Sequence, residues 1–353
     1  MTQYLSNKIK ILSFFLIIFV LYIHSGFHAN EIDGMYWNHF IQEFISVKVG
    51  RLAVPLFFMI SGYLFFLNTD SGILSIKNKM MSRVHSILIP YIYGCIFFVM
   101  FLLLIQFIPG VANFMNGDIL PLFNKSMLNI LKSVFWISDG GNTPLAFQLW
   151  FLRDLIIIIA LTPLLYYFLR LLKWWALPLL FALSYLSITP ESFLSSLFWF
   201  TLGGIFVFTK TSIEYRKSKW GLIILFLYLI VSLYEQIIGG GSYFESLQKV
   251  LILLGIVGIW FCYDTLVCNN FSLKDTKWLS IACSFTLFIY LFHEPTLNIV
   301  RKLIVIGIGK SSAGYLISYL ISPYLLVFCA IVVGVILKRT IPRIYSNLVG
   351  GRI

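Results

Sequence analysis

Residues 86–108 read SILIPYIYGCIFFVMFLLLIQFI, an apolar run of 23 residues without a single charged side chain. The hydrocarbon core of a bilayer is about 30 Å thick, and a helix needs about 20 apolar residues to cross it. This run is long enough to do so. It predicts a transmembrane helix, and with it a protein whose solvent is the lipid bilayer.

Runs of the same kind occur along the whole chain, which has 353 residues, of which 59% are hydrophobic and only 11% charged. No water-soluble globular domain has such a composition. We therefore predict an all-α, polytopic transmembrane helical bundle of about ten helices, forming one membrane domain over residues 1–353. The other runs fall at roughly 11–28, 52–67, 147–169, 174–189, 193–209, 220–238, 248–268, 278–298 and 314–337.

The basic residues agree with this membrane topology. Lys and Arg number 26 against 14 Asp and Glu, a net charge of +12. In a soluble protein this excess would suggest nucleic-acid binding, but here the basic residues lie mainly between the apolar runs, as the positive-inside rule requires. We expect membrane lipids and no nucleic acid as partners, both termini in the cytoplasm, and a multi-pass protein of the bacterial inner membrane.

Three further features of the sequence concern signal-peptide cleavage, metal binding and the longest loop. The first apolar run lacks a signal-peptidase site, so we expect it to remain as a helix. The five cysteines show no zinc-binding spacing, and no metal site is predicted. The longest external stretch, about 109–146, is rich in turn formers such as Pro109-Gly110 and Asn116-Gly117, and we expect an irregular outer loop that covers a substrate entrance.

His24 is the first polar residue that calls for an explanation. It lies near the outer end of the first predicted helix, and an ionisable residue at membrane depth costs about 2.5 to 3.5 kcal/mol on insertion scales. A neutral imidazole there can accept a proton from a hydroxyl. The alternative is a histidine that is hydrogen-bonded between helices or sits among the headgroups.

Arg51 opens the segment Arg51-Leu-Ala-Val-Pro-Leu-Phe-Phe-Met-Ile-Ser61-Gly62-Tyr63. Its guanidinium is always charged, so it is suited to stabilising an oxyanion or orienting a phosphate, whereas the alternative is an arginine that snorkels to the interface. Ser61-Gly62 either contributes to a site or only lets two helices pack closely.

A second imidazole and a carboxylate, His293 and Glu294, precede Pro295 in the ninth run, at the same predicted depth as His24. Two histidines, a carboxylate and an arginine would then converge on one catalytic site. The alternative is an ordinary helix end with Glu294 in the headgroups. Asp264 and Glu235 lie near other helix ends, and we interpret both as interfacial.

A basic cluster flanks the first and third helices on the predicted cytoplasmic side. It comprises Lys8, Lys10, Lys77, Lys79, Arg83 and His85. Such a cluster suits a donor that carries several phosphates. The alternative is that these residues only anchor the chain by the positive-inside rule.

Taken together, these motifs resemble the membrane acyltransferase-3 family. That family typically has a histidine ending its first helix, an R-x-x-V-P-x-F-F-x-x-S-G-[FY] segment, a basic run before L-x-P-Y, an L-W-F-L segment and a late H-x-P element. The corresponding stretches here are His24, 51–63, 79–91, 148–155 and 292–295. The resemblance spans nearly the whole chain.

The resemblance implies an O-acyltransferase that moves an acyl group, most often acetyl, from acyl-coenzyme A to a hydroxyl of a cell-surface polysaccharide or glycolipid precursor. Its catalytic candidates are His24, Arg51, His293 and Glu294, and its substrate-binding candidates are Ser61, Trp150 and Arg153. Lys10, Lys79 and Arg83 would bind the phosphates of coenzyme A.

One position departs from the family. Members commonly carry an arginine eleven residues before the histidine, and this chain has Ser13 there. Lys10, three residues earlier and on nearly the same helix face, is a candidate substitute.

Two functions from other classes compete with acyl transfer. Polar residues within helices also mark translocation paths, so a transporter or flippase for a lipid-linked glycan is the main alternative. It would be favoured by inverted repeats or a coupling-ion site, and the sequence shows neither. A sensor or scaffold would leave His24, Arg51 and His293 without a use.

Overall fold

The computed structural model describes residues 1–27, 32, 34–69, 72–106, 108, 122, 124–138, 141–185, 192–215, 220–239, 242–267 and 276–351. Over these ranges the secondary structure is helical and contains no strand. The all-α prediction is confirmed. The turn residues Pro109-Gly110 and Asn116-Gly117 of the expected outer loop lie outside the described residues.

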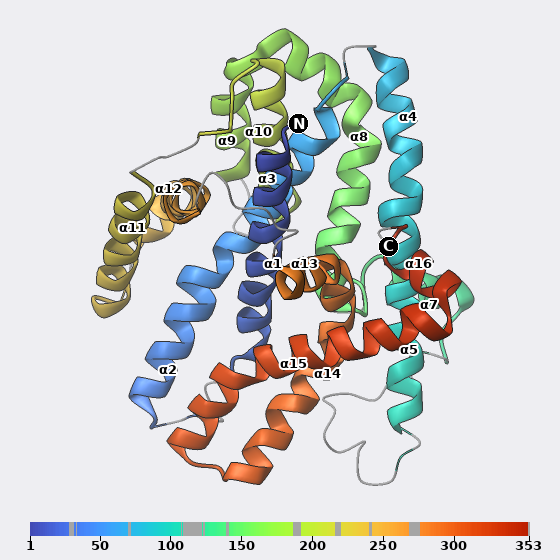
Figure 1. The fold of residues 1–353 in the computed structure, drawn as a ribbon, viewed down its shortest axis with the longest axis vertical. Helices are drawn as coiled ribbons and strands as arrows, with labels where there is room; N and C mark the ends of the chain where they lie inside the picture. The colour runs from blue at the N-terminus through green and yellow to red at the C-terminus, as the bar shows by residue number, and fades with distance from the viewer. Residues whose placement is uncertain are drawn as a thin grey trace.

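Figure 1 shows the helices as a bundle in which α1, α5 and α8 run along the long axis and α15 crosses them at a steep angle. The α-helices are α1 (Gln3–Ser25), α2 (Tyr36–Glu43), α3 (Ala53–Phe66), α4 (Ile73–Arg83), α5 (Ile89–Gln106), α7 (Met127–Phe135), α8 (Trp150–Leu172), α9 (Ala176–Tyr185), α10 (Phe193–Phe208), α11 (Trp220–Ile237), α12 (Ser242–Leu266), α13 (Lys277–Ser284), α14 (Thr286–Ile308), α15 (Ser312–Thr340) and α16 (Pro342–Leu348). Shorter π and 3-10 turns join several of them: η1 (Phe44–Val49), η2 (Gly50–Leu52), η3 (Val84–Leu88), η5 (Phe147–Leu149) and η6 (Lys173–Trp175).

Seven helical stretches within the described residues are long and apolar enough to cross a bilayer. The predicted count of about ten was therefore approximate. Within the run at 174–189, residues 176–185 form α9, which continues from α8 through a 3-10 turn, and the run at 193–209 contains the 16-residue α10. The run at 278–298 is divided between α13 and α14, because the chain leaves the helix between them, and α14 extends to Ile308.

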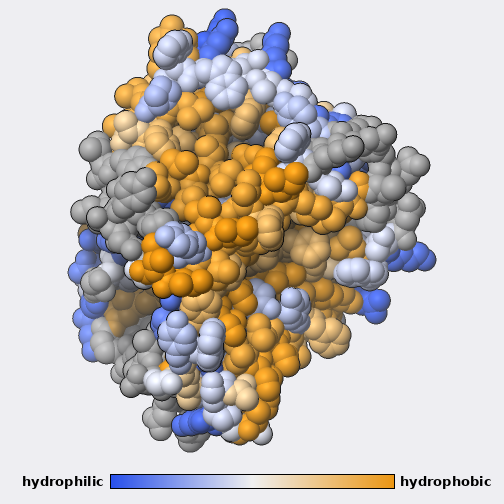
Figure 2. All heavy atoms as spheres, turned by 90° about the vertical axis from the view of Figure 1, so that its left-hand side faces the viewer, coloured by the Kyte–Doolittle hydropathy of each residue, from blue (hydrophilic) through white to orange (hydrophobic). Residues whose placement is uncertain are grey.

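Exposed side chains agree with a lipid-facing surface. Figure 2 shows a broad hydrophobic area across the middle of one face, with hydrophilic residues above and below it. α11 contributes exposed large hydrophobic side chains along much of its length, among them Leu222, Phe226, Ile230 and Ile237. Such a band would be unfavourable in water and is expected of a multi-pass membrane protein.

α1 is the central helix of the bundle. It contacts α3, α12, α13, α14 and α15, and Leu16, Ile17 and Leu21 in its middle are almost completely buried. Thr2 caps its beginning by accepting a hydrogen bond from the backbone N–H of Leu5. The helix that carries His24 is thus held by packing against five other helices.

Glycines bring α3 and α10 into direct backbone contact. A Cβ on Gly62 would lie 1.8 Å from the carbonyl oxygen of Phe200, and a Cβ on Gly203 would lie 1.9 Å from that of Met59. Small residues allow such an approach between membrane helices. Gly62 therefore serves helix packing, as one of the two interpretations of Ser61-Gly62 predicted.

Three irregularities in the helices lie next to predicted site residues. The π turn η1 ends one residue before η2, which contains Arg51, and the π turn η3 directly follows Arg83. Glu294 has non-helical backbone angles inside α14. Local departures from α-helix geometry are frequent at functional sites.

Candidate active site

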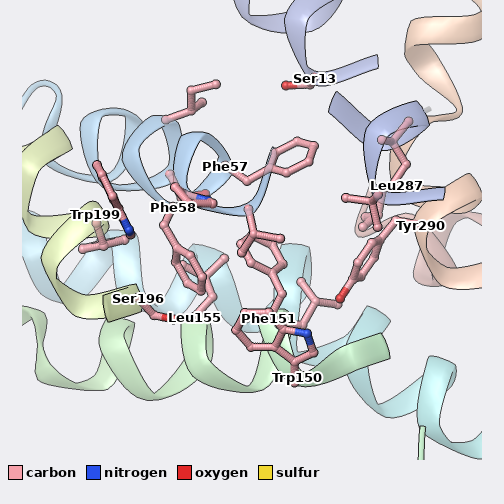
Figure 3. Close-up of a pocket in the computed structure, with 18 of the residues that line it drawn as sticks. Ser13, Phe57, Phe58, Trp150, Phe151, Leu155, Ser196, Trp199, Leu287 and Tyr290 are labelled. Carbon is pink, nitrogen blue, oxygen red and sulfur yellow. The ribbon is translucent and has the colours of Figure 1, made fainter. Parts of the chain in front are cut away.

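A single cavity of about 660 Å³ brings most of the predicted site residues together. Its walls come from α1, α3, α4, α5, α8, α10, α12, α13, α14 and the turns beside them. Figure 3 shows aromatic side chains of α3 and α8 grouped at the cavity, including Phe58, Trp150 and Phe151, with Tyr290 to one side. The rings of Phe58 and Phe151 pack against each other at 4.6 Å.

One face of α1 lines this cavity from Lys10 to His24. Lys10, Ser13, Ile17, Val20 and His24 all belong to the lining, and their spacing of three and four residues puts them on one side of a helix. Fourteen residues at 1.5 Å each span about 21 Å. The cavity thus connects the basic part of α1 with its terminal histidine.

His24 lies in the last turn of α1, beside His293. The ring centroids of the two histidines are 5.2 Å apart, and Phe147 packs edge-on against His24 at 5.5 Å. Nδ1 of His293 lies 2.6 Å from the carbonyl oxygen of Tyr290, so Nδ1 carries the proton and Nε2 holds a lone pair. This Nε2 is buried and has no hydrogen-bond partner among the described residues.

Glu294 and Arg301 complete the surroundings of the histidines. Both side chains are almost completely buried, and Arg301 is near enough for its positive charge to act on His24 and Glu294. Its guanidinium donates to the backbone carbonyl of Gly26, directly after α1, and to Oδ1 of Asn298 at 3.1 Å. His24 and His293 thus lie side by side, whereas His293 and Glu294 are outside the cavity lining to which His24 and Arg51 belong.

Arg51 and Ser61 both line the cavity. Arg51 is half-buried, and the described residues offer its guanidinium neither a hydrogen bond nor an ion pair. Ser61 faces the cavity while its neighbour Gly62 packs against α10, so the two residues have separate surroundings.

Of the two candidates on α8, only Trp150 lines the cavity. The guanidinium of Arg153 instead contacts Asp154 at 2.8 Å and donates to the carbonyl oxygens of Trp136 and Asn142. Arg153 therefore ties the segment after α7 to the beginning of α8. Its predicted part in substrate binding has no geometric support.

Two of the three predicted donor-binding residues line the cavity. Lys10 is exposed and Arg83 is half-buried, and Ser13 and Ser86 lie in the same lining. Lys79 lies elsewhere: its ammonium donates to the carbonyl oxygens of Phe65 and Leu67, where α3 ends. A cation at that position compensates the negative end of the helix.

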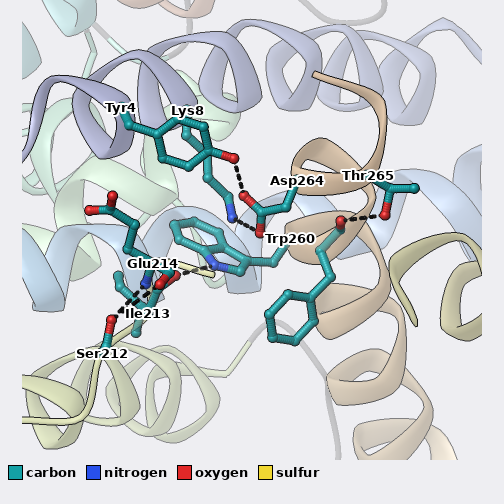
Figure 4. A network of polar contacts seen from close by, with 9 residues as sticks. Tyr4, Lys8, Ser212, Ile213, Glu214, Trp260, Asp264 and Thr265 are labelled. Atoms are coloured by element: carbon teal, nitrogen blue, oxygen red, sulfur yellow. Dashed lines mark hydrogen bonds and ion pairs between the residues drawn. The ribbon is translucent and has the colours of Figure 1, made fainter. Parts of the chain in front are cut away.

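Lys8 has an environment quite different from that of Lys10. Figure 4 shows it in a network with Tyr4, Asp264 and Trp260. Its ammonium lies 2.6 Å from Oδ2 of Asp264, and both side chains are fully buried. The ammonium also lies 4.1 Å from the centroid of a Trp260 ring.

Asp264 and Glu235, interpreted from the sequence as interfacial, both have ion-pair partners within the protein. Asp264 pairs with Lys8 in the interior, and Glu235 pairs with Lys48 at 2.7 Å with only 12% of its side chain exposed. Each carboxylate neutralises a lysine from a distant part of the sequence. Their position near helix ends did not reveal these partners.

Comparison with known proteins decides the family. A family model described as an acyltransferase domain matches residues 7–339, nearly the whole chain. The chain belongs to the membrane acyltransferase-3 family. No curated protein and no solved structure gives a significant match.

Membership of the acyltransferase-3 family makes acyl transfer the general activity and supports it over the transporter alternative. The structure also shows where Ser13 lies, the position at which this chain departs from the family pattern. Ser13 lies in the cavity lining, where an arginine would have placed a charge, and Lys10 lies one turn away in the same lining. Lys10, the candidate substitute named from the sequence, therefore faces the same cavity as Ser13.

Two residues of this acyltransferase site were missed among the sequence candidates. Arg301 lies in α14, and nothing in the sequence around it indicates that it comes near His24. Only the fold brings the two residues together. Gln148 was quoted as part of the L-W-F-L segment but was not assigned a role. It lies at the cavity wall, and its Nε2 donates to the carbonyl oxygen of Glu294 at 3.2 Å. A polar residue directly before an apolar helix was the available signal.

Proposed function

We propose that the chain transfers an acyl group, acetyl in the simplest case, from acyl-coenzyme A to a hydroxyl of a cell-surface polysaccharide or glycolipid precursor in the bacterial inner membrane. The observation that carries the proposal is the face of α1 that lines one cavity from Lys10 to His24. It joins a basic region suited to phosphates to an imidazole suited to a hydroxyl.

The donor would lie along this cavity. Lys10 and Arg83 would hold its phosphates through charge-assisted hydrogen bonds, while the apolar wall formed by Ile17 and Val20 would accept the pantetheine arm. Acyl-coenzyme A supplies an activated thioester, and the cavity is long enough to bring that thioester to His24. This donor fits the cavity because the cationic side chains of Lys10 and Arg83 lie in one part of its lining and His24 lies in another.

His24 would act as the general base. It would take the proton of the acceptor hydroxyl as the hydroxyl oxygen bonds to the thioester carbonyl carbon, and would return that proton to the sulfur as the carbon–sulfur bond breaks. Arg51, which lines the same cavity, would stabilise the negative charge on the carbonyl oxygen.

His293 and Glu294 would act through His24. With its proton on Nδ1, His293 offers a lone pair at Nε2, and a small rotation of either ring would let it accept an N–H from His24. The other nitrogen of His24 would then be the one that meets the acceptor. Arg301, whose guanidinium donates to the carbonyl of Gly26 directly after α1, would place a positive charge near His24.

The proposal is tested with purified protein in lipid nanodiscs. Acetyl-coenzyme A is titrated against wild type, Arg83→Gln and Arg170→Gln, the last being an exposed arginine outside the cavity. We expect the dissociation constant to rise about tenfold or more for Arg83→Gln and to remain near wild type for Arg170→Gln, because loss of one charge-assisted contact removes roughly 1.5 kcal/mol or more.

A lack of measurable binding by the wild type would refute acyl-coenzyme A as donor. Equal dissociation constants for the two variants would instead remove Arg83 from donor binding and leave the donor itself in place. The acceptor is identified separately, by mass spectrometry of surface glycans from cells with and without the gene.

A further inference from the structure

The charged side chains that line the cavity are all cationic. Within the described residues they are Lys10, Arg51, Arg83 and Lys249, and the lining contains no aspartate or glutamate. In the proposed function, the phosphates of the donor neutralise Lys10 and Arg83. Lys249 is held by Ser184, because its ammonium donates to the backbone carbonyl and to the hydroxyl oxygen of that residue. These contacts leave Arg51 without a partner in the part of the chain that the structure describes.

The guanidinium of Arg51 is accessible to a ligand. The side chain is half-buried and lines the cavity, and no other described residue forms a hydrogen bond or an ion pair with it. None of its nitrogens belongs to the buried polar atoms that lack a partner, so these unpaired nitrogens keep accessible surface. A planar guanidinium with available N–H donors binds a carboxylate or a phosphate through two parallel hydrogen bonds.

The packing of Gly50 fixes where Arg51 lies relative to His24. A Cβ on Gly50 would lie 2.8 Å from Cγ1 of Ile23, so η2 packs directly on the last turn of α1. Arg51 follows Gly50 as His24 follows Ile23, and both residues line the cavity. Arg51 is therefore level with His24, whereas Lys10 lies about 21 Å away along α1.

The helix α3 leads away from His24 towards the beginning of α1. Tyr63, near the end of α3, shares a small cavity with Thr2 and Leu5. A side chain on a helix leans towards the N-terminal end of its helix, and Arg51 lies in the 3-10 turn η2 just before α3. Its guanidinium is thus directed away from the region of the donor phosphates, and an anion that binds there has another source.

We infer that Arg51 binds an anionic group of the acceptor, a carboxylate or a phosphate that lies close to the hydroxyl to be acylated. This inference rests on the proposed function and narrows the acceptor from a glycan of any charge to an acidic one. Arg51 keeps its proposed action on the oxyanion, because a guanidinium has five N–H donors and a bidentate anion occupies two of them. The bound anion fixes the sugar while the neighbouring hydroxyl meets His24.

Two other anions have to be distinguished from the acceptor. One is the phosphate of an anionic lipid headgroup, which an arginine that snorkels to the interface would contact. The other is the terminal carboxylate of a dicarboxylic acyl group, such as succinyl, which the donor would bring to His24. The experiment has a separate arm for each.

The test compares three ligands with the same sugar ring. Methyl β-D-glucuronide carries a carboxylate, methyl β-D-glucoside 6-phosphate carries a phosphate, and methyl β-D-glucuronamide is neutral. Each is titrated against purified wild type, Arg51→Gln and Arg170→Gln in phosphatidylcholine nanodiscs. Saturating coenzyme A is present, because it occupies Lys10 and Arg83 and has no acyl group to transfer. Arg170 is the matched control, an exposed arginine outside the cavity.

We expect wild type and Arg170→Gln to bind at least one of the two anions about tenfold or more tightly than the amide, because charge-assisted hydrogen bonds are stronger than neutral ones. Arg51→Gln should bind all three ligands alike, and Arg51→Lys, which keeps the charge, should retain part of the preference. The anion that binds more tightly identifies the acceptor as a uronic acid or a sugar phosphate.

A wild type that binds the amide as tightly as both anions overturns the inference, and so does a preference that persists in Arg51→Gln. Loss of the preference in nanodiscs that also contain phosphatidylglycerol assigns Arg51 to lipid headgroups and overturns it as well. Tighter binding of succinyl- than of acetyl-coenzyme A by wild type, but not by Arg51→Gln, assigns the anion to the acyl group with the same consequence. Absence of coenzyme A binding by the wild type is instead the failure of the proposed function, and the comparison of the three sugars still decides whether Arg51 binds an anion.

Discussion

His24 and His293 are neighbours that differ in their surroundings. His293 is completely buried and bound through Nδ1 to a backbone carbonyl, whereas His24 is half-buried and lines the cavity. A base has to reach its substrate, so His24 is the imidazole suited to proton transfer and His293 the one suited to orienting it. Two histidines that looked equivalent in sequence thus have different surroundings, and for this reason the proposed function gives them separate roles.

Replacing His24 by Asn should reduce acyl transfer at least about 100-fold, because general-base catalysis contributes about 10² to 10⁴. Yield and thermal stability of the purified protein should stay near wild type, since the described residues form no hydrogen bond with this ring. His39→Asn is the matched control, because His39 is exposed on α2 and pairs only with Glu43. Transfer by the two variants is compared in a single-turnover assay. Equal rates would exclude His24 from the chemistry.

At the scale of the element, α1 has one face that packs in the interior and another that lines the cavity. Lys8 faces Asp264 and Trp260 in the interior, and Lys10 lines the cavity. Two residues correspond to about 200° around a helix, so lysines this close in sequence have opposite surroundings. The same helix is therefore anchored by one lysine and available to a ligand through the other.

Lys8→Met should destabilise the protein by about 3–5 kcal/mol, because it leaves the carboxylate of Asp264 buried without its partner. Lys10→Gln should leave the unfolding midpoint near wild type and raise the dissociation constant for acetyl-coenzyme A. Thermal unfolding in detergent and donor titration are measured for both variants. A stable Lys8→Met protein, or a Lys10→Gln protein with unchanged donor affinity, would contradict the assignment of the two faces.

α3 has two faces as well, with Ser61 on the cavity and Gly62 on α10. Gly62→Ala should sharply lower the yield of folded protein, because its Cβ would overlap the backbone of Phe200 and overpacking costs about 1–3 kcal/mol or more. Gly307→Ala is the control: Gly307 also lies in a helix, but a Cβ there meets nothing within 4 Å. Size-exclusion profiles of the two variants should differ clearly, and similar profiles would show that the α3–α10 contact tolerates a methyl group.

At the scale of the whole molecule, the cavity is an assembly of helices far apart in sequence. Cys283 at the end of α13 lines it together with Lys10, whereas Cys329 on α15 does not. A ligand that occupies the cavity would therefore cover one thiol and leave the other unaffected.

Acetyl-coenzyme A should slow alkylation of Cys283 by N-ethylmaleimide several-fold in a variant that retains only this cysteine. A variant that retains only Cys329 should react at the same rate with and without the donor. Both thiols are partly exposed, so they form a matched pair. Rates are followed by mass spectrometry. Unprotected Cys283 at saturating donor would show that the donor binds outside this cavity.

The sequence by itself determined the membrane class, the helical fold and the family. Apolar runs of about twenty residues leave the chain no stable alternative to transmembrane helices, and the segment from Arg51 to Tyr63 carries the family resemblance that the match over residues 7–339 confirms. Of the ten site residues predicted from the sequence, the structure places six in one cavity lining: His24, Arg51, Ser61, Trp150, Lys10 and Arg83. His293 and Glu294 lie outside that lining.

Only the tertiary structure decided which polar residues serve the site and which hold the bundle together. Lys79 ends α3, Arg153 ties down a connecting segment, and Asp264 neutralises Lys8, although each looked in sequence like a surface or site residue. The physical reason is that an ion pair or hydrogen bond depends on where a partner lies in space, and the partner here is up to 256 positions away in the chain. Hydrophobic length is a local property and can be read from sequence, whereas the partner of a buried polar group follows from packing.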